Sequence, residues 1–260
     1  MEMVTSKDGT TIAFDRMGDG PPVVLVCGQS TDRSSNAPLA ALLAPDFTVL
    51  NYDRRGRGDS GDTRPYAVQR EVEDIGALIG EAGGSASVFG VSSGAALALE
   101  AAANGLAIDK LALWEPPFDA DEDRRPPRDL AERYEAMIAE GRRGDVIEYF
   151  MANVVGLPPE FVAHAKTQPF WRRQEAMAHT FVYDTIVMGD GSLPVDRAAA
   201  VAAPTLALAG AESFPFMRET AQKLADVMPD ARARILEDQT HAVAPAVLAP
   251  VLGEFFGNRT

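Results

Sequence analysis

The sequence predicts an α/β fold with a mostly parallel sheet, because short apolar runs alternate with segments of helical period. The chain has 260 residues, of which 46% are hydrophobic and 24% are charged, which is enough for one large core. Strand-like runs are expected at residues 23–27, 47–52, 87–89, 111–114 and 205–209. Helix-period segments between or after them cover residues 68–82, 94–103, 217–228 and 243–256. Strands that are apolar on both faces, joined through helices, are typical of a parallel sheet covered on both sides.

The first elements follow the same pattern. Residues 10–15 alternate polar and apolar side chains, which predicts a half-exposed edge strand. Pro21 and Pro22 then introduce the apolar run 23–27, whose length and lack of charge predict a strand buried on both faces. A further short strand is expected at residues 233–236, directly before the last helix.

The alternation is interrupted once, after Trp114. Residues 119–196 contain helical segments with acidic and proline-rich connections but no run typical of a buried strand. We therefore expect residues 1–118 and 197–260 to form the α/β core, with residues 119–196 inserted as a helical lid over the carboxyl ends of the strands.

Several large apolar side chains of the predicted lid are candidates for substrate contact. They are Trp171, Met177, Phe181 and Met188. Each of them, taken singly, fits a place in the lid's own small core better than a place facing the site, because most large apolar residues are buried.

The pentapeptide Gly90-Val91-Ser92-Ser93-Gly94 lies between the strand-like run 87–89 and the helical segment that follows. Gly-x-Ser-x-Gly in a strand-to-helix turn is typical of a nucleophile elbow, in which small residues flank a serine whose hydroxyl is pushed outward. Ser92 is therefore the candidate nucleophile.

Charge and cysteine content limit the partners. A formal net charge of −14 without a basic block disfavours nucleic acid and anionic membranes. Cys27 is the only cysteine, so no intrachain disulfide and no cysteine-based zinc site can form. No signal peptide or membrane span is expected. These features predict a cytoplasmic monomer or homodimer that binds a small molecule and needs no metal or cofactor.

Four segments together resemble the α/β-hydrolase family over nearly the whole chain outside the predicted lid. They are the strand end at residues 26–28, the loop Asp53-Arg54-Arg55-Gly56-Arg57-Gly58-Asp59-Ser60, the Ser92 elbow, and Thr240-His241 before the last helix. The resemblance implies an eight-stranded, mostly parallel sheet flanked by helices. It also implies a serine nucleophile, a histidine base, a carboxylate that orients the base, and hydrolysis or a related acyl transfer.

The family's chain order of nucleophile, acid and histidine assigns His241 as the base. His164 and His179 lie in the predicted lid, where structural or solvated roles are expected. The acid departs from the common pattern, because Ser213 occupies its usual position, three residues after Gly210.

Two carboxylates are therefore candidates for the acid. Glu115 ends the strand that follows the nucleophile's helix, a position that some family members use, and Glu212 lies next to the usual position. We favour Glu115, because a carboxylate at the end of an apolar strand needs a partner. Glu212, Asp238 and a dyad without acid stay open as alternatives.

By family position, the backbone amides of Gln29 and Ser93 form the oxyanion hole. Gly28 allows a close backbone approach beside the substrate, and Cys27 is interpreted as a small buried residue. Residues 56–61 match G-x-G-x-x-G, but Pro65 interrupts the helix that a dinucleotide site requires, so this match is interpreted as accidental.

These residues predict a serine hydrolase that cleaves an uncharged, fairly hydrophobic ester, lactone or related acyl substrate through an acyl-enzyme. A serine rather than an aspartate at position 92 excludes dehalogenase and epoxide hydrolase chemistry. Carbon–carbon bond hydrolysis, perhydrolysis, natural-product cyclisation and a non-catalytic small-molecule receptor remain alternatives on the same scaffold.

Overall fold

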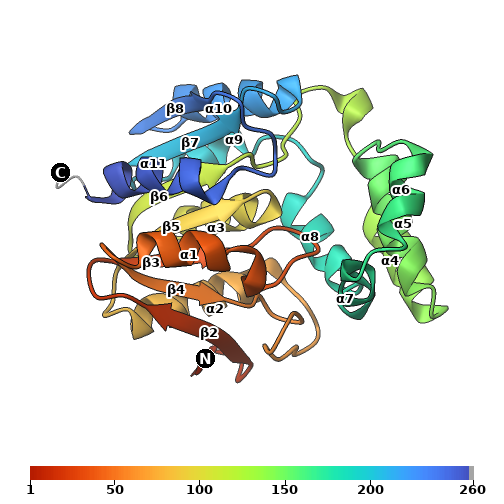
Figure 1. Ribbon diagram of the computed structural model, residues 1–260, viewed down its shortest axis with the longest axis horizontal. Helices are drawn as coiled ribbons and strands as arrows, with labels where there is room; N and C mark the ends of the chain where they lie inside the picture. Colours follow the sequence, from red (N-terminus) through yellow and green to blue (C-terminus); the bar gives the residue numbers. More distant parts are fainter. Residues whose placement is uncertain (258–260) are drawn as a thin grey trace.

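The strands form one eight-stranded sheet in the computed structural model, which describes residues 1–257 (Figure 1). The strands are β1 (Glu2–Thr5), β2 (Thr11–Met17), β3 (Pro22–Val26), β4 (Thr48–Tyr52), β5 (Ala86–Val91), β6 (Ile108–Trp114), β7 (Thr205–Gly210) and β8 (Ala231–Leu236). Their order is β1-β2-β4-β3-β5-β6-β7-β8. β1 and β2 pair antiparallel, as do β2 and β4, and all the other pairs are parallel. The prediction of a mostly parallel α/β sheet is confirmed.

One expectation about the sheet edge is wrong. The alternating segment that predicted an edge strand forms β2, but β2 lies between β1 and β4. The edge is formed by the short strand β1, which the sequence pattern did not reveal because its four residues are mostly exposed. In β2, Ile12 and Phe14 pack into the core, and Ala13 between them is buried as well.

Helices cover both faces of the sheet, as the fully apolar strands require. In β3, Val23 and Leu25 pack with α1 (Ala37–Leu43) and α11 (Pro245–Gly257). Val24 and Val26 point to the opposite face, where they join the core formed with α2 (Val68–Glu81), α3 (Ser93–Ala103) and α10 (Pro215–Val227). Alternate side chains of one strand therefore serve two separate cores.

The segment between β6 and β7 is helical. Its elements are η2 (Glu122–Arg124), α4 (Leu130–Ala139), α5 (Arg143–Tyr149), the π-helical turn η3 (Phe150–Val154), α6 (Pro159–Ala165), α7 (Phe170–Ala176), α8 (Thr180–Met188) and α9 (Val195–Ala199). Helices α4 to α7 form a group beside the sheet, and α8 runs between this group and the core (Figure 1). The group shares an apolar core with α8, which includes Leu130, Tyr134, Trp171 and Phe181.

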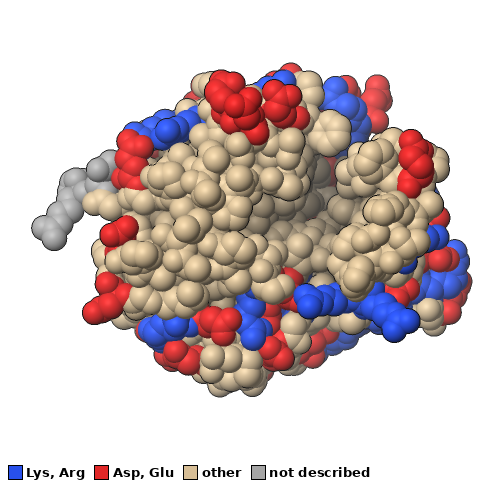
Figure 2. Space-filling model, in the orientation of Figure 1, with Lys and Arg blue, Asp and Glu red and all other residues tan. Residues whose placement is uncertain are grey.

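Helix α8 is the main connection between the two parts, since it contacts α4 on one side and α2 and α3 on the other. Figure 2 shows that the surface is hollowed between the core and the helical group, and that the hollow is bordered largely by uncharged residues. The helical segment is thus placed where a lid is expected, although its action as a lid stays a prediction.

Candidate active site

Ser92 occupies a sharp turn between β5 and α3. Its backbone has φ 56° and ψ −126°, a strained conformation for a residue with a side chain. The turn is tight because Gly90 and Gly94 allow close packing: a Cβ atom on Gly90 would lie 2.4 Å from the Gly94 carbonyl oxygen, and one on Gly94 would lie 2.4 Å from that of Cys27. The Ser92 amide donates to the Trp114 carbonyl at 2.8 Å, which fixes the turn to β6.

Glu115 is the first residue after β6 and has a positive φ of 46°. Its side chain is completely buried. Oε1 accepts a hydrogen bond from the Gly210 amide at 2.7 Å, and Oε2 accepts one from Nδ1 of His241 at 2.6 Å. Burial raises the pKa of this carboxyl, but the hydrogen bonds from His241 and Gly210 outweigh it, so the net pKa is lowered. Glu115 is therefore the ionised partner that the imidazole requires.

His241 lies on the loop between β8 and α11, and its side chain is 45% exposed. Trp114 Nε1 donates to the His241 carbonyl at 3.0 Å. Gln239 braces the same loop, because its Oε1 accepts from the Ala244 amide at 2.9 Å. Since Nδ1 donates to Glu115, Nε2 carries the lone pair and can act as a base.

The other two candidate acids are placed differently. Glu212 and Asp238 have exposed side chains, and no hydrogen bond or ion pair joins either of them to His241 in the described part of the chain. Their backbones are engaged instead: the Glu212 amide donates to the Gln239 carbonyl at 2.9 Å, and the Asp238 carbonyl accepts from Gln239 Nε2 at 3.0 Å. Of the candidate acids, Glu115 is thus the one that the structure brings to the imidazole.

Ser92 and His241, the predicted nucleophile and base, are not hydrogen bonded to each other in the described structure. Within residues 1–257, neither Ser92 Oγ nor His241 Nε2 bonds another protein group, so both are free to engage each other or a substrate. Catalytic hydrogen bonds of this kind are often long without substrate and tighten when it binds.

The two predicted oxyanion amides belong to segments that meet at the elbow. A Cβ atom on Gly28 would lie 3.2 Å from Ser92 Cβ, so the loop after β3 passes directly beside Ser92. Within residues 1–257, neither the Gln29 nor the Ser93 amide donates to another protein group. Ser93 is also the first residue of α3, whose N-terminal dipole favours negative charge.

Four non-glycine residues of the described chain have positive φ, and all of them follow strands at the carboxyl edge of the sheet. They are Ser30 after β3, Ser92 after β5, Glu115 after β6 and Asp238 after β8. Strained backbone of this kind clusters at functional sites. The distribution is an independent indication that this edge of the sheet is the site.

The predicted substrate-contact residues separate into two groups. Trp171 and Phe181 are buried in the apolar core of the helical segment. Met188 packs against the core that the sheet forms with α2, α3 and α10. Met177 lines a pocket of about 360 Å³ between the loop after β3 and α7, together with Ser30, Thr31, Phe170 and Gln174 among others. Ser30 Oγ and Gln174 Oε1 are buried there without a hydrogen-bond partner in the described chain.

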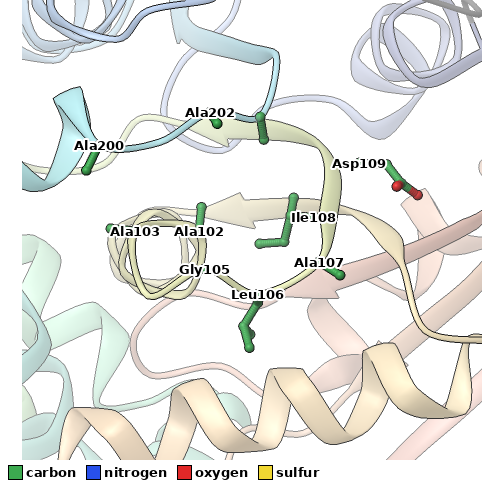
Figure 3. A pocket seen from close by; sticks show the side chains of 10 residues that line it. Ala102, Ala103, Gly105, Leu106, Ala107, Ile108, Asp109, Ala200 and Ala202 are labelled. Atoms are coloured by element: carbon green, nitrogen blue, oxygen red, sulfur yellow. The ribbon is translucent and has the colours of Figure 1, made fainter.

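A second pocket, of about 350 Å³, lies at the opposite edge of the sheet (Figure 3). It is lined by small aliphatic residues such as Ala102, Leu106, Ile108 and Ala202, with Asp109 at its rim. Ile108 is the first residue of β6, whereas Glu115 follows its last. Its lining holds no serine, cysteine or histidine, so it is no candidate for the reaction.

Sequence reasoning missed two polar side chains around the site, Gln239 and Asp184. Gln239 braces the His241 loop, and Asp184 of α8 forms a buried cluster with Arg57 and Arg54. The repeated arginines in the loop after β4 indicated that carboxylates pair with them, but the sequence did not indicate which carboxylates. In the described part of the chain, no group of three or more His, Cys, Asp or Glu side chains is arranged to hold a metal ion.

A serine elbow after a parallel strand, with a histidine and a buried carboxylate at the same edge of the sheet, defines a class of α/β proteins that use an activated hydroxyl. A family model described as "Alpha/beta hydrolase family" matches residues 23–251. The chain therefore belongs to the α/β hydrolase family, and the prediction of a hydrolase is confirmed at this level.

The solved structures agree with this assignment. An α/β hydrolase from Sphaerobacter thermophilus is 56% identical, covers 98% of this chain and 100% of its own, and has a TM-score of 0.92. The enol-lactonase from Burkholderia xenovorans LB400 shares the fold at 22% identity, with a TM-score of 0.73 and coverage of 99% and 100%.

A curated relative matches only in part. The "Probable oxidoreductase EphD" of Mycobacterium bovis is 38% identical over 84 residues, which cover 30% of this chain but only 14% of that protein. Within residues 1–257, no helix has both the length and the apolar character needed to cross a membrane.

Proposed function

We propose that the protein is a serine hydrolase that cleaves an uncharged, fairly hydrophobic ester, lactone or related acyl substrate. The observation that carries this proposal is the hydrogen bond of 2.6 Å between His241 Nδ1 and the fully buried Glu115, at the edge of the sheet where Ser92 is held in a strained turn. A buried ionised carboxylate bonded to one imidazole nitrogen leaves the other free to act as a base.

In the proposed reaction, Ser92 Oγ attacks the substrate carbonyl carbon and its proton passes to His241 Nε2. The carbonyl oxygen becomes an oxyanion, which the Gln29 and Ser93 amides stabilise. The bond to the leaving group then breaks, and His241 returns the proton to it. Water attacks the resulting acyl-enzyme through the same base, which releases the acid and restores Ser92.

The pocket beside the loop after β3 is the proposed site for part of the substrate, with Met177 and Phe170 as apolar walls. The helical segment is proposed to act as a lid over it. Location in the cytoplasm, and the monomeric or dimeric state, stay predictions from the sequence.

The decisive experiment combines a covalent label with turnover. The protein is treated with a fluorophosphonate and the adduct is located by mass spectrometry, while nitrophenyl esters of increasing chain length are tested as substrates. An adduct on Ser92 that is absent from heat-denatured protein and from the Ser92→Ala variant supports the proposal. If the protein shows neither labelling nor ester turnover, the receptor alternative is favoured instead.

A further inference from the structure

Asp184 is a fully buried carboxylate that the helical segment contributes to the core beside the elbow. It lies on α8 and accepts three hydrogen bonds: from Arg54 Nη1 at 2.7 Å, from Arg57 Nη2 at 2.7 Å and from Ser93 Oγ at 2.8 Å. The two arginines come from the loop after β4, and Ser93 directly follows the proposed nucleophile. One side chain therefore connects three segments that are distant in sequence.

The charges in this cluster are balanced. Burial alone would raise the pKa of Asp184, but the charges of Arg57 and Arg54 lower it, so the carboxyl is ionised. Arg54 also binds Glu71 through Nε at 2.6 Å and Nη2 at 2.8 Å. Two cations thus face two anions, which is the arrangement that makes buried charge tolerable.

Arg57 connects Asp184 to the first oxyanion amide. Its Nη1 donates to the Gly28 carbonyl at 2.5 Å and to the Thr31 carbonyl at 3.1 Å. The Gly28 carbonyl and the Gln29 amide belong to the same planar trans peptide, so they point in opposite directions. By fixing the carbonyl, Arg57 fixes the direction of the Gln29 N–H. A charged donor on the carbonyl also polarises the peptide and makes its N–H a stronger donor.

Ser93 connects Asp184 to the second oxyanion amide. The Ser93 side chain is buried against Asp184, which holds the residue after the nucleophile in place. Its own backbone N–H remains free in the described structure. The same carboxylate therefore restrains both peptides that are proposed to bind the oxyanion.

From these contacts we propose that Asp184, acting through Arg57 and Ser93, is the positioning residue of the oxyanion hole. The inference rests on the proposed function and adds to it that the helical segment, by carrying Asp184, completes the catalytic geometry of the core. Asp184 touches no substrate in this scheme, so its loss affects the transition state more than substrate binding.

The test compares Asp184→Asn with a matched control, Asp74→Asn. Asp74 is as deeply buried and pairs with the neighbouring arginine, Arg55, through two bonds of 2.8 and 2.7 Å, but it contacts neither oxyanion segment. Both substitutions remove one charge from a buried arginine pair. The measurements are kcat and KM for a nitrophenyl ester, the inhibition constant of a trifluoromethyl ketone that forms a tetrahedral oxyanion adduct, and the thermal unfolding temperature.

We expect Asp184→Asn to lower kcat by about 10- to 100-fold, somewhat less than the loss of a whole oxyanion donor. KM should change little, and the inhibition constant should rise in proportion to the loss in kcat. Asp74→Asn should change kcat by no more than about twofold, even where it lowers the unfolding temperature as much. Arg57→Lys keeps a cation beside Asp184 but cannot reach both Asp184 and the Gly28 carbonyl, so it should reproduce the loss if Asp184→Asn does not fold.

Equal effects of Asp184→Asn and Asp74→Asn on kcat and on inhibitor binding would overturn the inference, because the cluster would then be merely structural. So would an Arg57→Lys variant with unchanged kcat. A wild-type protein without ester turnover and without a fluorophosphonate adduct on Ser92 is a different result, which would refute the proposed function itself and with it this inference.

Discussion

Glu115 illustrates how a single side chain defines the chemistry available at the site. It is fully buried, its pKa is lowered mainly through the hydrogen bond from His241 against the effect of burial, and its second oxygen is held by the Gly210 amide. An ionised carboxylate held on both oxygens keeps the imidazole in one tautomer and orientation. The position that more commonly carries the acid holds Ser213, which cannot be ionised.

Replacing this carboxylate tests the assignment directly. We expect Glu115→Gln to lower kcat by about 10²- to 10⁴-fold, because an amide can hold the imidazole in the wrong tautomer and cannot stabilise its cation. Glu212→Gln, an exposed change three residues before α10 begins, should alter kcat by no more than about twofold. Steady-state hydrolysis of a nitrophenyl ester measures both, and the reverse ranking would show that Glu212 is the acid.

At the scale of elements, α8 is the helix that joins the helical segment to the core. Tyr183 donates to Asp62 at 2.9 Å and stacks on Tyr66 with ring centroids 3.9 Å apart, which fixes the helix to the loop before α2. The next residue, Asp184, enters the core. His179, just before the helix, lies between Arg143, 3.1 Å from Nδ1, and Asp62, 3.5 Å from Nε2.

The surroundings of His179 predict a pH dependence of stability. Burial lowers its pKa, and Arg143 lowers it further while Asp62 acts in the opposite direction. The folded protein therefore binds this proton less readily than the unfolded chain, and the stabilisation is present above the unfolded pKa and lost as pH falls through the folded pKa. We expect the unfolding temperature to fall less steeply between pH 8 and pH 5 in His179→Gln than in the wild type.

The control for this effect is His164→Gln, because His164 is an exposed residue of α6. It should keep the wild-type pH dependence. If His179→Gln and His164→Gln gave the same slope of unfolding temperature against pH, the burial of His179 would contribute nothing to acid sensitivity.

At the scale of the whole molecule, the sequence allowed the sheet, the elbow and the His241 pairing with Glu115 to be anticipated, because each leaves a local pattern at a strand end. It did not reveal Asp184, which lies 91 residues from Ser93 and meets it only when α8 docks. Nor could it decide that Trp171 and Phe181 lie in the core of the helical segment, since substrate-facing and core residues have the same composition. Contacts that form only when α8 packs on the core leave no periodic pattern in the sequence.

The net charge of −14 also acts on the whole molecule. Repulsion among surface carboxylates destabilises the folded state, and salt screens it as the Debye length falls from about 30 Å at 0.01 M to about 8 Å at 0.15 M. We expect the unfolding temperature at pH 7 to rise by a few degrees over this range of sodium chloride, at roughly 2–4 °C for each kcal/mol.

A matched measurement at pH 5 tests the cause of that rise. Partial protonation of exposed carboxylates lowers the net charge there, so the gain with salt should be smaller. An equal gain at both pH values would point to an effect of salt on apolar burial instead of on charge.

The backbone of Ser92 carries a cost that the rest of the fold must offset. Its φ of 56° suits glycine, so Ser92→Gly should release about 1–3 kcal/mol of conformational strain, against about 0.5–1 kcal/mol for the extra freedom of glycine in the unfolded chain. We expect Ser92→Gly to lose ester hydrolysis, and calorimetry should give it a higher unfolding temperature than the wild type. Ser92→Ala, which retains Cβ, should lose hydrolysis without a rise in unfolding temperature. A serine in a backbone conformation that favours glycine lowers the stability of the fold, and strain of this kind is typical of functional sites.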